Sequence, residues 1–124
     1  PAIAPDMLVV NAPAPLFAHH LPLMRAANRS LAAARDRPLG SCVLVSWRSA
    51  PFNAGLLLLR PDHAALAALR HAVAHVPHDL DSAEQGLLNA VFPLAQAVHE
   101  LPLAYNANVV ARRCEAEEWE AVDA

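Results

Sequence analysis

Apolar residues along this chain occur in short runs that proline and glycine interrupt. The runs at residues 7–10, 42–47 and 52–59 have the length and composition of buried strands. Between and after them, apolar residues recur at helical spacing over 21–34, 61–76 and 82–91, with one or two helical turns also expected over 14–20. A last short strand is predicted at 101–105. Strands that alternate with helices predict an α/β fold.

Two helices have clear boundary signals. Pro61 suits the first turn of a helix because its φ is already fixed, and Asp62 favours the positive end of the helix dipole. Pro77 then ends that helix. The next helix begins at Ser82 or Ala83, where Asp81 or Ser82 is positioned to cap it.

The composition limits both the core and the partners. Of 124 residues 56% are apolar but only 5% are aromatic, and alanine is abundant, so the core is thin. No apolar run approaches the about 18 residues of a membrane helix. The chain contains no lysine, and residues 1–114 hold nine arginines and seven acids. Without a basic stripe, nucleic acid is not expected as a partner.

The two ends and the cysteines carry little specific signal. Five acids lie within residues 111–124, which we expect to be an exposed acidic tail. The chain begins with Pro1, which indicates processing or excision from a longer protein. Cys42 and Cys114 lie far apart and have no metal-ligand spacing, so two free thiols are expected.

Two segments with polar residues interrupt the apolar pattern of the predicted strands and helices, and both are candidates for a functional site. Asn53 and Gly55 fall within the strand at 52–59, where a buried amide needs a partner and glycine permits close approach. The structural alternative is a β-bulge in which Asn53 bonds to neighbouring backbone. The second segment is 79–89, which has three carboxylates and two amides around one helix start. Its structural alternative is ordinary helix capping.

In this order, the motifs resemble those of the glycogenin-like family 8 glycosyltransferases. That family has a Phe-Asn-Ser/Ala-Gly strand ending in a basic residue and proline, then Asp-x-x-Asp-Gln-Gly-x-Leu-Asn, then Leu-Pro-x-x-Tyr-Asn. The matching residues here are 52–55 with 60–61, 81–89 and 101–106. The resemblance covers residues 1–110. It implies the second half of a GT-A domain, a mixed sheet with flanking helices and the first nucleotide-binding half absent. It also implies that 31–36 is a strand rather than the end of a helix.

The resemblance implies transfer of a sugar from a UDP-sugar to an acceptor, with retention at the anomeric carbon. It assigns catalytic positions to Asp81, Glu84 and Gln85, and donor-binding positions to Asn53, Ala54, Gly55, Asp81 and Asn106. Asp6 matches the second aspartate of the family's Asp-x-Asp, which holds Mn²⁺ or Mg²⁺, whereas Ala4 replaces the first and cannot ligate a metal. Glu84 stands where the family has aspartate. We therefore expect the isolated chain to be inactive.

Two other interpretations remain open. The chain could be a degenerate transferase relic that acts as an interaction or dimerisation module, which the replacements at positions 4 and 84 favour. A metal-binding module built on His71, His75 and His78 is the other, because the first two lie one helical turn apart. No carboxylate or cysteine completes that set, so we interpret these residues, and the pair His19–His20, as surface histidines.

Overall fold

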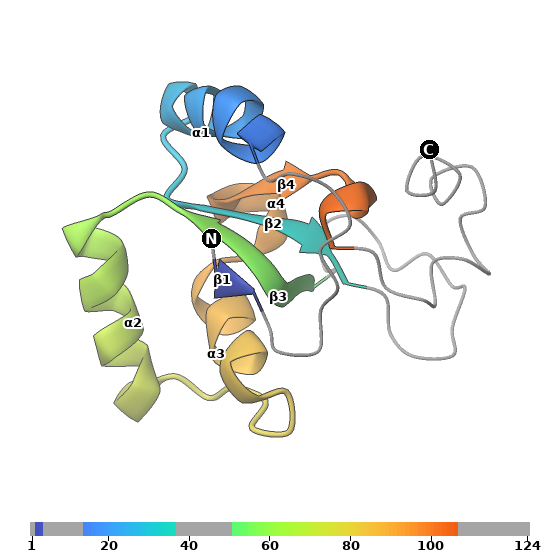
Figure 1. The fold of residues 1–124 in the computed structure, drawn as a ribbon. Helices are drawn as coiled ribbons and strands as arrows, with labels where there is room; N and C mark the ends of the chain where they lie inside the picture. Colours follow the sequence, from blue (N-terminus) through green and yellow to red (C-terminus); the bar gives the residue numbers. More distant parts are fainter. Residues whose placement is uncertain (1, 4–13, 37–50, 107–124) are drawn as a thin grey trace.

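The chain forms a small mixed sheet with helices on both faces (Figure 1). The computed structural model describes residues 2–3, 14–36 and 51–106. The elements in order are β1 (Ala2–Ile3), η1 (Leu16–His20), α1 (Leu21–Ala26), β2 (Leu31–Arg35), β3 (Phe52–Leu59), α2 (His63–His75), α3 (Ala83–Val91), α4 (Leu94–Ala97), β4 (Val98–Leu101) and η2 (Leu103–Tyr105). The predicted α/β class, with a mixed sheet and flanking helices, is confirmed.

The sheet has the strand order β1-β3-β2-β4. β3 pairs antiparallel with both β1 and β2, while β2 pairs in parallel with β4. The parallel partner is reached only after β3, α2, α3 and α4, because a parallel connection needs a long crossover. The strand order therefore brings the end of β2 beside β3 and β4, although those strands are distant in sequence.

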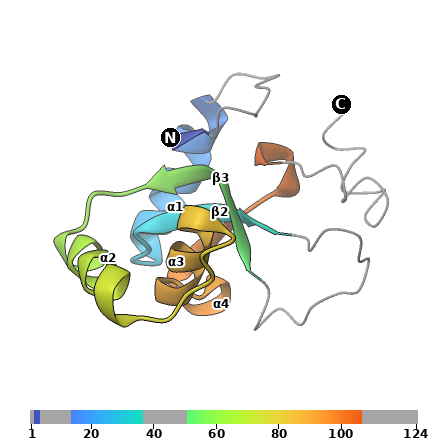
Figure 2. The same cartoon turned by 90° about the horizontal axis from the view of Figure 1, so that it is seen from below.

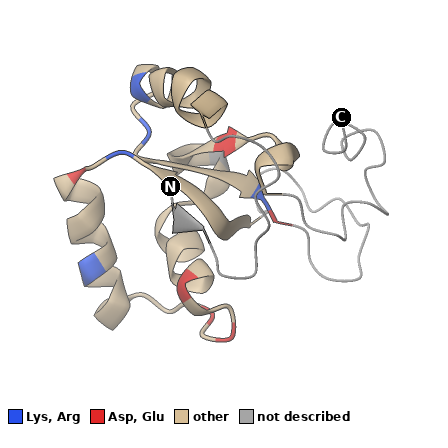
Figure 3. Cartoon of the chain, in the orientation of Figure 1, with Lys and Arg blue, Asp and Glu red and all other residues tan. Residues whose placement is uncertain are grey.

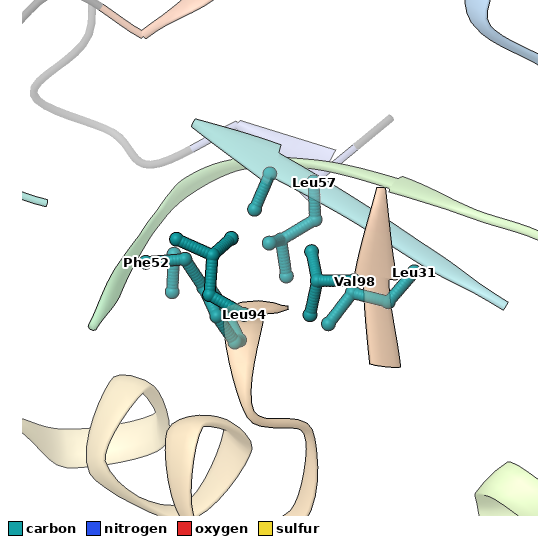
Figure 4. Packing of buried hydrophobic residues seen from close by; sticks show 7 residues of the cluster. Leu31, Phe52, Leu57, Leu94 and Val98 are labelled. Atoms are coloured by element: carbon teal, nitrogen blue, oxygen red, sulfur yellow. The ribbon is translucent and has the colours of Figure 1, made fainter. Parts of the chain in front are cut away.

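The two faces of the sheet form two separate cores, because successive side chains of a strand point to opposite faces. One core lies under α3 and α4 (Figure 4) and contains Leu31, Ala33, Phe52, Ala54, Leu57, Leu94 and Val98. The other lies under η1 and α1 and contains Leu16, Met24, Ala32, Ala34, Leu56, Leu58 and Leu101. Figure 1 shows α1 above the strands and α3 below them, and in Figure 2, which is seen from below, α3 lies in front of β2.

β3 is regular in its second half and bulged in its first. β2 advances two residues from Ala33 to Arg35, whereas the paired positions on β3 run from Leu57 back to Phe52, which is five residues. The three extra residues on β3 change the face of the sheet toward which the side chains of that strand point. As a result, Ala54 and Leu57 face the same core although they are three apart. The bulge falls on Asn53 and Gly55.

The two long helices match their predicted ranges with small shifts at the ends. α2 begins at His63 rather than Pro61, and the Asp62 carboxylate caps it by accepting from the backbone N–H groups of Ala64 and Ala65 at 2.8 and 3.2 Å. Ser30 donates its hydroxyl to the same carboxylate at 2.5 Å. This bond ties the start of α2 to the turn before β2.

Two predicted elements differ from the structure. The periodicity that suggested a helix to residue 34 was wrong, because the helix ends at Ala26 and residues 31–35 form β2, as the family resemblance implied. The strand predicted at 101–105 was also wrong. β4 ends at Leu101 because Pro102 has no N–H for a sheet ladder, and a 3-10 turn follows. The predicted strands at 7–10 and 42–47, Ala4, Asp6 and the tail at 111–124 lie outside the described residues.

Candidate functional site

A connected polar network lies at the bulge of β3, where four segments distant in sequence meet. Asp36, which follows β2, accepts from Asn53 Nδ2 at 3.1 Å through Oδ1 and from Gln85 Nε2 at 2.8 Å through Oδ2. Asn53 Oδ1 in turn accepts from Asn106 Nδ2 at 2.8 Å. Asn53 and Gln85 therefore donate to one carboxylate and Asn106 donates to Asn53, and the bonds of such a chain strengthen one another at low dielectric.

Side-chain amides also replace missing strand pairing at the bulge. Gln85 Oε1 accepts from Ala54 N at 2.9 Å, while Asn89 accepts from Phe52 N at 2.8 Å and donates to Phe52 O at 2.9 Å. Asn53 Oδ1 accepts a second bond, from Gly55 N at 2.8 Å. Buried backbone groups require such partners. The bulge with Asn53 bonded to neighbouring backbone is thus confirmed, and α3 is docked onto β3 by Gln85 and Asn89.

The loop before α3 is held by Asp79. Its carboxylate accepts from Asp81 N at 3.0 Å and from the Ser82 hydroxyl, and these bonds, the hydroxyl first, lower the pKa of Asp79. Its carbonyl oxygen lies so close to Gly86 that a Cβ there would be 1.9 Å away. Glycine is therefore required at this position. The expectation that the side chain of Asp81 or Ser82 caps the helix was wrong, since Ser82 makes no side-chain cap bond and Asp79 stabilises the loop instead.

The predicted site residues divide into two groups. Asn53, Gln85 and Asn106 come together in the network, and Ala54 and Gly55 contribute backbone N–H groups to it. Asp81 and Glu84 lie exposed at the start of α3. Among the described residues, the network does not include their side chains. Asp6 lies outside the described residues.

Asp36 is the network residue that the sequence analysis did not assign to a site. It was identified only as the end of the alanine-rich strand at 31–36. A single half-buried carboxylate after a buried strand is the signal that could have identified it, because a carboxylate at a strand end requires hydrogen-bond donors nearby. The neighbouring residue, Arg35, pairs with Glu100 Oε1 at 2.6 Å and so orients the end of β2 against β4.

A second cluster lies on the face of the sheet that η1 covers. His20 Nδ1 and His99 Nε2 are 3.1 Å apart, and the ring of Tyr105 meets that of His20 edge-on at 5.1 Å. His20 is only 6% exposed, so the expectation that it is a surface histidine was wrong, whereas His19 is exposed as expected. Burial is the main cause that lowers the pKa of both His20 and His99, and the neighbouring positive charges lower it further.

The charge distribution and the metal-ligating residues add little to either cluster. Figure 3 shows that charged residues are few and scattered over the fold. In α2, which runs from His63 to His75, Arg70 is the one residue among Lys, Arg, Asp and Glu. Within residues 2–3, 14–36 and 51–106, no group of three or more His, Cys, Asp or Glu side chains is arranged to hold a metal ion. Across the same ranges, no helix has the length and apolar character needed to cross a bilayer.

Comparisons with protein-family models, with curated proteins and with solved structures find no match. The arrangement of the network and the motif resemblance are therefore the basis for a functional interpretation.

Proposed function

We propose that this chain contributes the sugar-binding half of a retaining glycosyltransferase that uses a UDP-sugar donor. The supporting observation is the convergence of Asp36, Asn53, Gln85 and Asn106 on one network. Three of these residues come from the three motifs that resemble the glycogenin-like family. Residues 53, 85 and 106 are separated along the chain, so their meeting at one place is not a consequence of local sequence.

The chemistry of the network suits a sugar. A hexose presents several hydroxyl groups, each both a donor and an acceptor, and amide and carboxylate side chains provide both functions in fixed directions. Each amide nitrogen has two hydrogens, and the network bonds use one each on Asn53, Gln85 and Asn106. Asn53, Gln85 and Asp36 are half-buried, which leaves them partly accessible from solvent.

Asp81 and Glu84 would face the reacting part of the donor in this proposal. Both lie exposed in the first turn of α3 or just before it, close in sequence to Gln85. Glu84 is one methylene longer than the aspartate of the family, and displacements of this size reduce catalysis strongly. The GT-A fold and the Mn²⁺ or Mg²⁺ belong to the same proposal. Binding of the metal would depend on Asp6.

Nuclear magnetic resonance titration of the chain tests sugar binding directly. We expect UDP-glucose or UDP-galactose to shift the backbone amide signals of Ala54, Gly55 and Gln85, whereas UDP alone does not shift them. The dissociation constant should be about 1 mM, equivalent to about 4 kcal/mol, because only part of a donor site is present. Equal shifts with UDP and with UDP-sugar, or no shifts at about 10 mM ligand, would contradict the proposal.

Matched variants assign such shifts to the network. Asp36→Asn retains the size of the side chain but removes its charge, and should weaken sugar binding about tenfold. Gln96→Ala truncates an exposed amide on α4 and should leave binding unchanged. Melting temperatures of both variants show whether a loss of binding is only a loss of folding.

A second candidate is an interaction or dimerisation module, which exposed apolar side chains favour. Leu66 and Val73 lie seven residues apart on α2 and are 46% and 64% exposed, and Leu80 beyond the helix is 78% exposed. Residues seven apart lie on the same helix face. For this candidate, sedimentation should show a dimer that Leu66→Lys with Val73→Lys converts to monomer. Ala67→Lys with Ala74→Lys, which adds the same charge at two other exposed positions of α2, should not do so. A wild-type monomer at about 100 µM, or a dimer that the double variant retains, would eliminate this candidate.

A further inference from the structure

Two histidines lie together on the exposed side of α2. His71 and His75 are four residues apart, so they occupy successive turns of one helix face. Their rings are stacked, with centroids 4.3 Å apart and planes inclined by 8°. Ala72, which is 1% exposed, anchors the intervening turn in the protein. Both rings are exposed to solvent while the backbone that bears them is fixed.

A hydrogen bond near the end of α2 determines which ring nitrogen of His75 can bind a metal ion. His75 Nδ1 lies 2.8 Å from the carbonyl oxygen of His71. A carbonyl oxygen only accepts, so Nδ1 carries the proton and Nε2 has the lone pair. This is the arrangement of most metal-ligating histidines, in which the other ring nitrogen donates to a backbone carbonyl or carboxylate.

We propose that His71 and His75 form a chelating site for a late first-row divalent transition metal such as Ni²⁺, Cu²⁺ or Zn²⁺. Neutral imidazole nitrogens suit these ions, and two histidines four residues apart on a helix are an established ligand pair for zinc. Both nitrogens must approach the ion to about 2.1 Å, so the two exposed rings must rotate out of their stacked arrangement when the ion binds. Water completes the coordination, since the described residues provide no set of three ligands. The site is independent of the sugar-binding network.

Calorimetric titration of the chain with Ni²⁺ tests the site. Ni²⁺ is used instead of Zn²⁺ because it binds less strongly to thiols such as those of Cys42 and Cys114. We expect a dissociation constant on the order of 10–100 µM for the wild-type chain. His71→Gln and His75→Gln should each weaken binding at least about tenfold, because each removes one of two ligands. His63→Gln removes an exposed histidine from the first turn of the same helix and should have no effect.

A relocation variant separates chelation from other effects of substitution. His75→Gln combined with Ala67→His recreates the four-residue spacing one turn earlier, with His71 and an exposed position. It should restore the affinity that His75→Gln loses. Two results would overturn the proposal. One is Ni²⁺ binding by His71→Gln and His75→Gln at wild-type affinity, and the other is an equal loss of binding in His63→Gln.

Discussion

The two halves of β3 are stabilised in different ways. Leu57–Leu59 pairs with β2 through the sheet ladder, and the side chains of Leu56, Leu57 and Leu58 alternate between the two cores. Phe52–Gly55 leaves that register, and its backbone N–H groups are bonded by the side chains of Asn53, Gln85 and Asn89. Apolar burial and the ladder stabilise the regular half. In the bulged half Phe52 and Ala54 are also buried, but the backbone depends in addition on a few specific amides. Among the described residues, the polar network forms at the bulged half, because the strand leaves its ladder there and its backbone needs side-chain partners.

The largest expected effect comes from disturbing the docking of α3. In Gly86→Ala, the added Cβ would lie 1.9 Å from the carbonyl oxygen of Asp79, so the loop or the helix must move. We expect a loss of about 3 kcal/mol in the free energy of unfolding, or failure to fold. Urea denaturation measures it. Ala90→Ser, on the exposed side of α3, should cost less than 1 kcal/mol. An equal loss in both variants would mean that the loop does not constrain α3.

A somewhat smaller effect is expected from removing the amide that pairs with β3. Asn89→Ala leaves the N–H and carbonyl of Phe52 without their partner, and should cost about 2 kcal/mol in the free energy of unfolding. Gln96→Ala, the truncation of an exposed amide on α4, is the matched control and should be nearly neutral. If Asn89→Ala is also neutral, water replaces the amide and the two halves of β3 differ less than we infer.

Stability should also depend on pH, because His20 and His99 form a pair that is shielded from solvent under η1. The pKa values of His20 and His99 are lowered in the folded chain, mainly by burial, relative to about 6.5 in the unfolded chain. Below pH 6.5 the unfolded chain therefore binds more protons. The contribution of the pair is complete above pH 6.5 and decreases as pH falls toward the lowered values.

Urea denaturation between pH 5 and pH 7.5 checks this dependence. His99→Gln should flatten the profile, because it removes one titrating partner of the pair. His63→Gln, at an exposed position, should leave the profile as in the wild type. If the free energy of unfolding of the wild type does not change across this pH range, the folded chain protonates His20 and His99 as easily as the unfolded chain does.

The smallest expected effect concerns the ion pair at the end of β2. Arg35 donates from Nε and Nη2 to Glu100 Oε1 at 3.1 and 2.6 Å, and both side chains are partly solvated. Glu100→Gln should therefore cost less than about 1 kcal/mol. The loss should shrink further in about 1 M NaCl, where charges are screened. A cost above 2 kcal/mol would mean that this pair stabilises the fold at least as strongly as the amides at the bulge.

The regular parts of the molecule were predictable from the sequence for physical reasons. The apolar run at 52–59 predicted β3 with the bounds that the structure has, and the helical spacing at 82–91 predicted α3 to within one residue. β2 was not found by periodicity, because Ala32, Ala33 and Ala34 are compatible with a helix. It followed only from the family resemblance. Proline at 102 was a signal against the strand predicted at 101–105.

The candidate site was only partly predictable. Asn53, Gln85 and Asn106 were identified by motif, but Asp36 was not, because its role depends on the sheet order that brings β2 beside β3. The burial of His20 was missed for the same reason, since its partner His99 is 79 residues away. Local patterns contain no information on such distant pairs.

The alanines of β2 have a consequence for how this protein could evolve. Leu31, Ala32, Ala33 and Ala34 are at most 2% exposed and face both cores at the centre of the sheet. Alanine contributes little burial, yet each added methyl group there would have to displace a helix or a strand, because interiors are close-packed. The segment with the weakest pattern in the sequence is therefore the one with the least room for substitution. The sequence of β2 should therefore change slowly during evolution. The leucines of β3 should change faster, because one large apolar residue can substitute for another there.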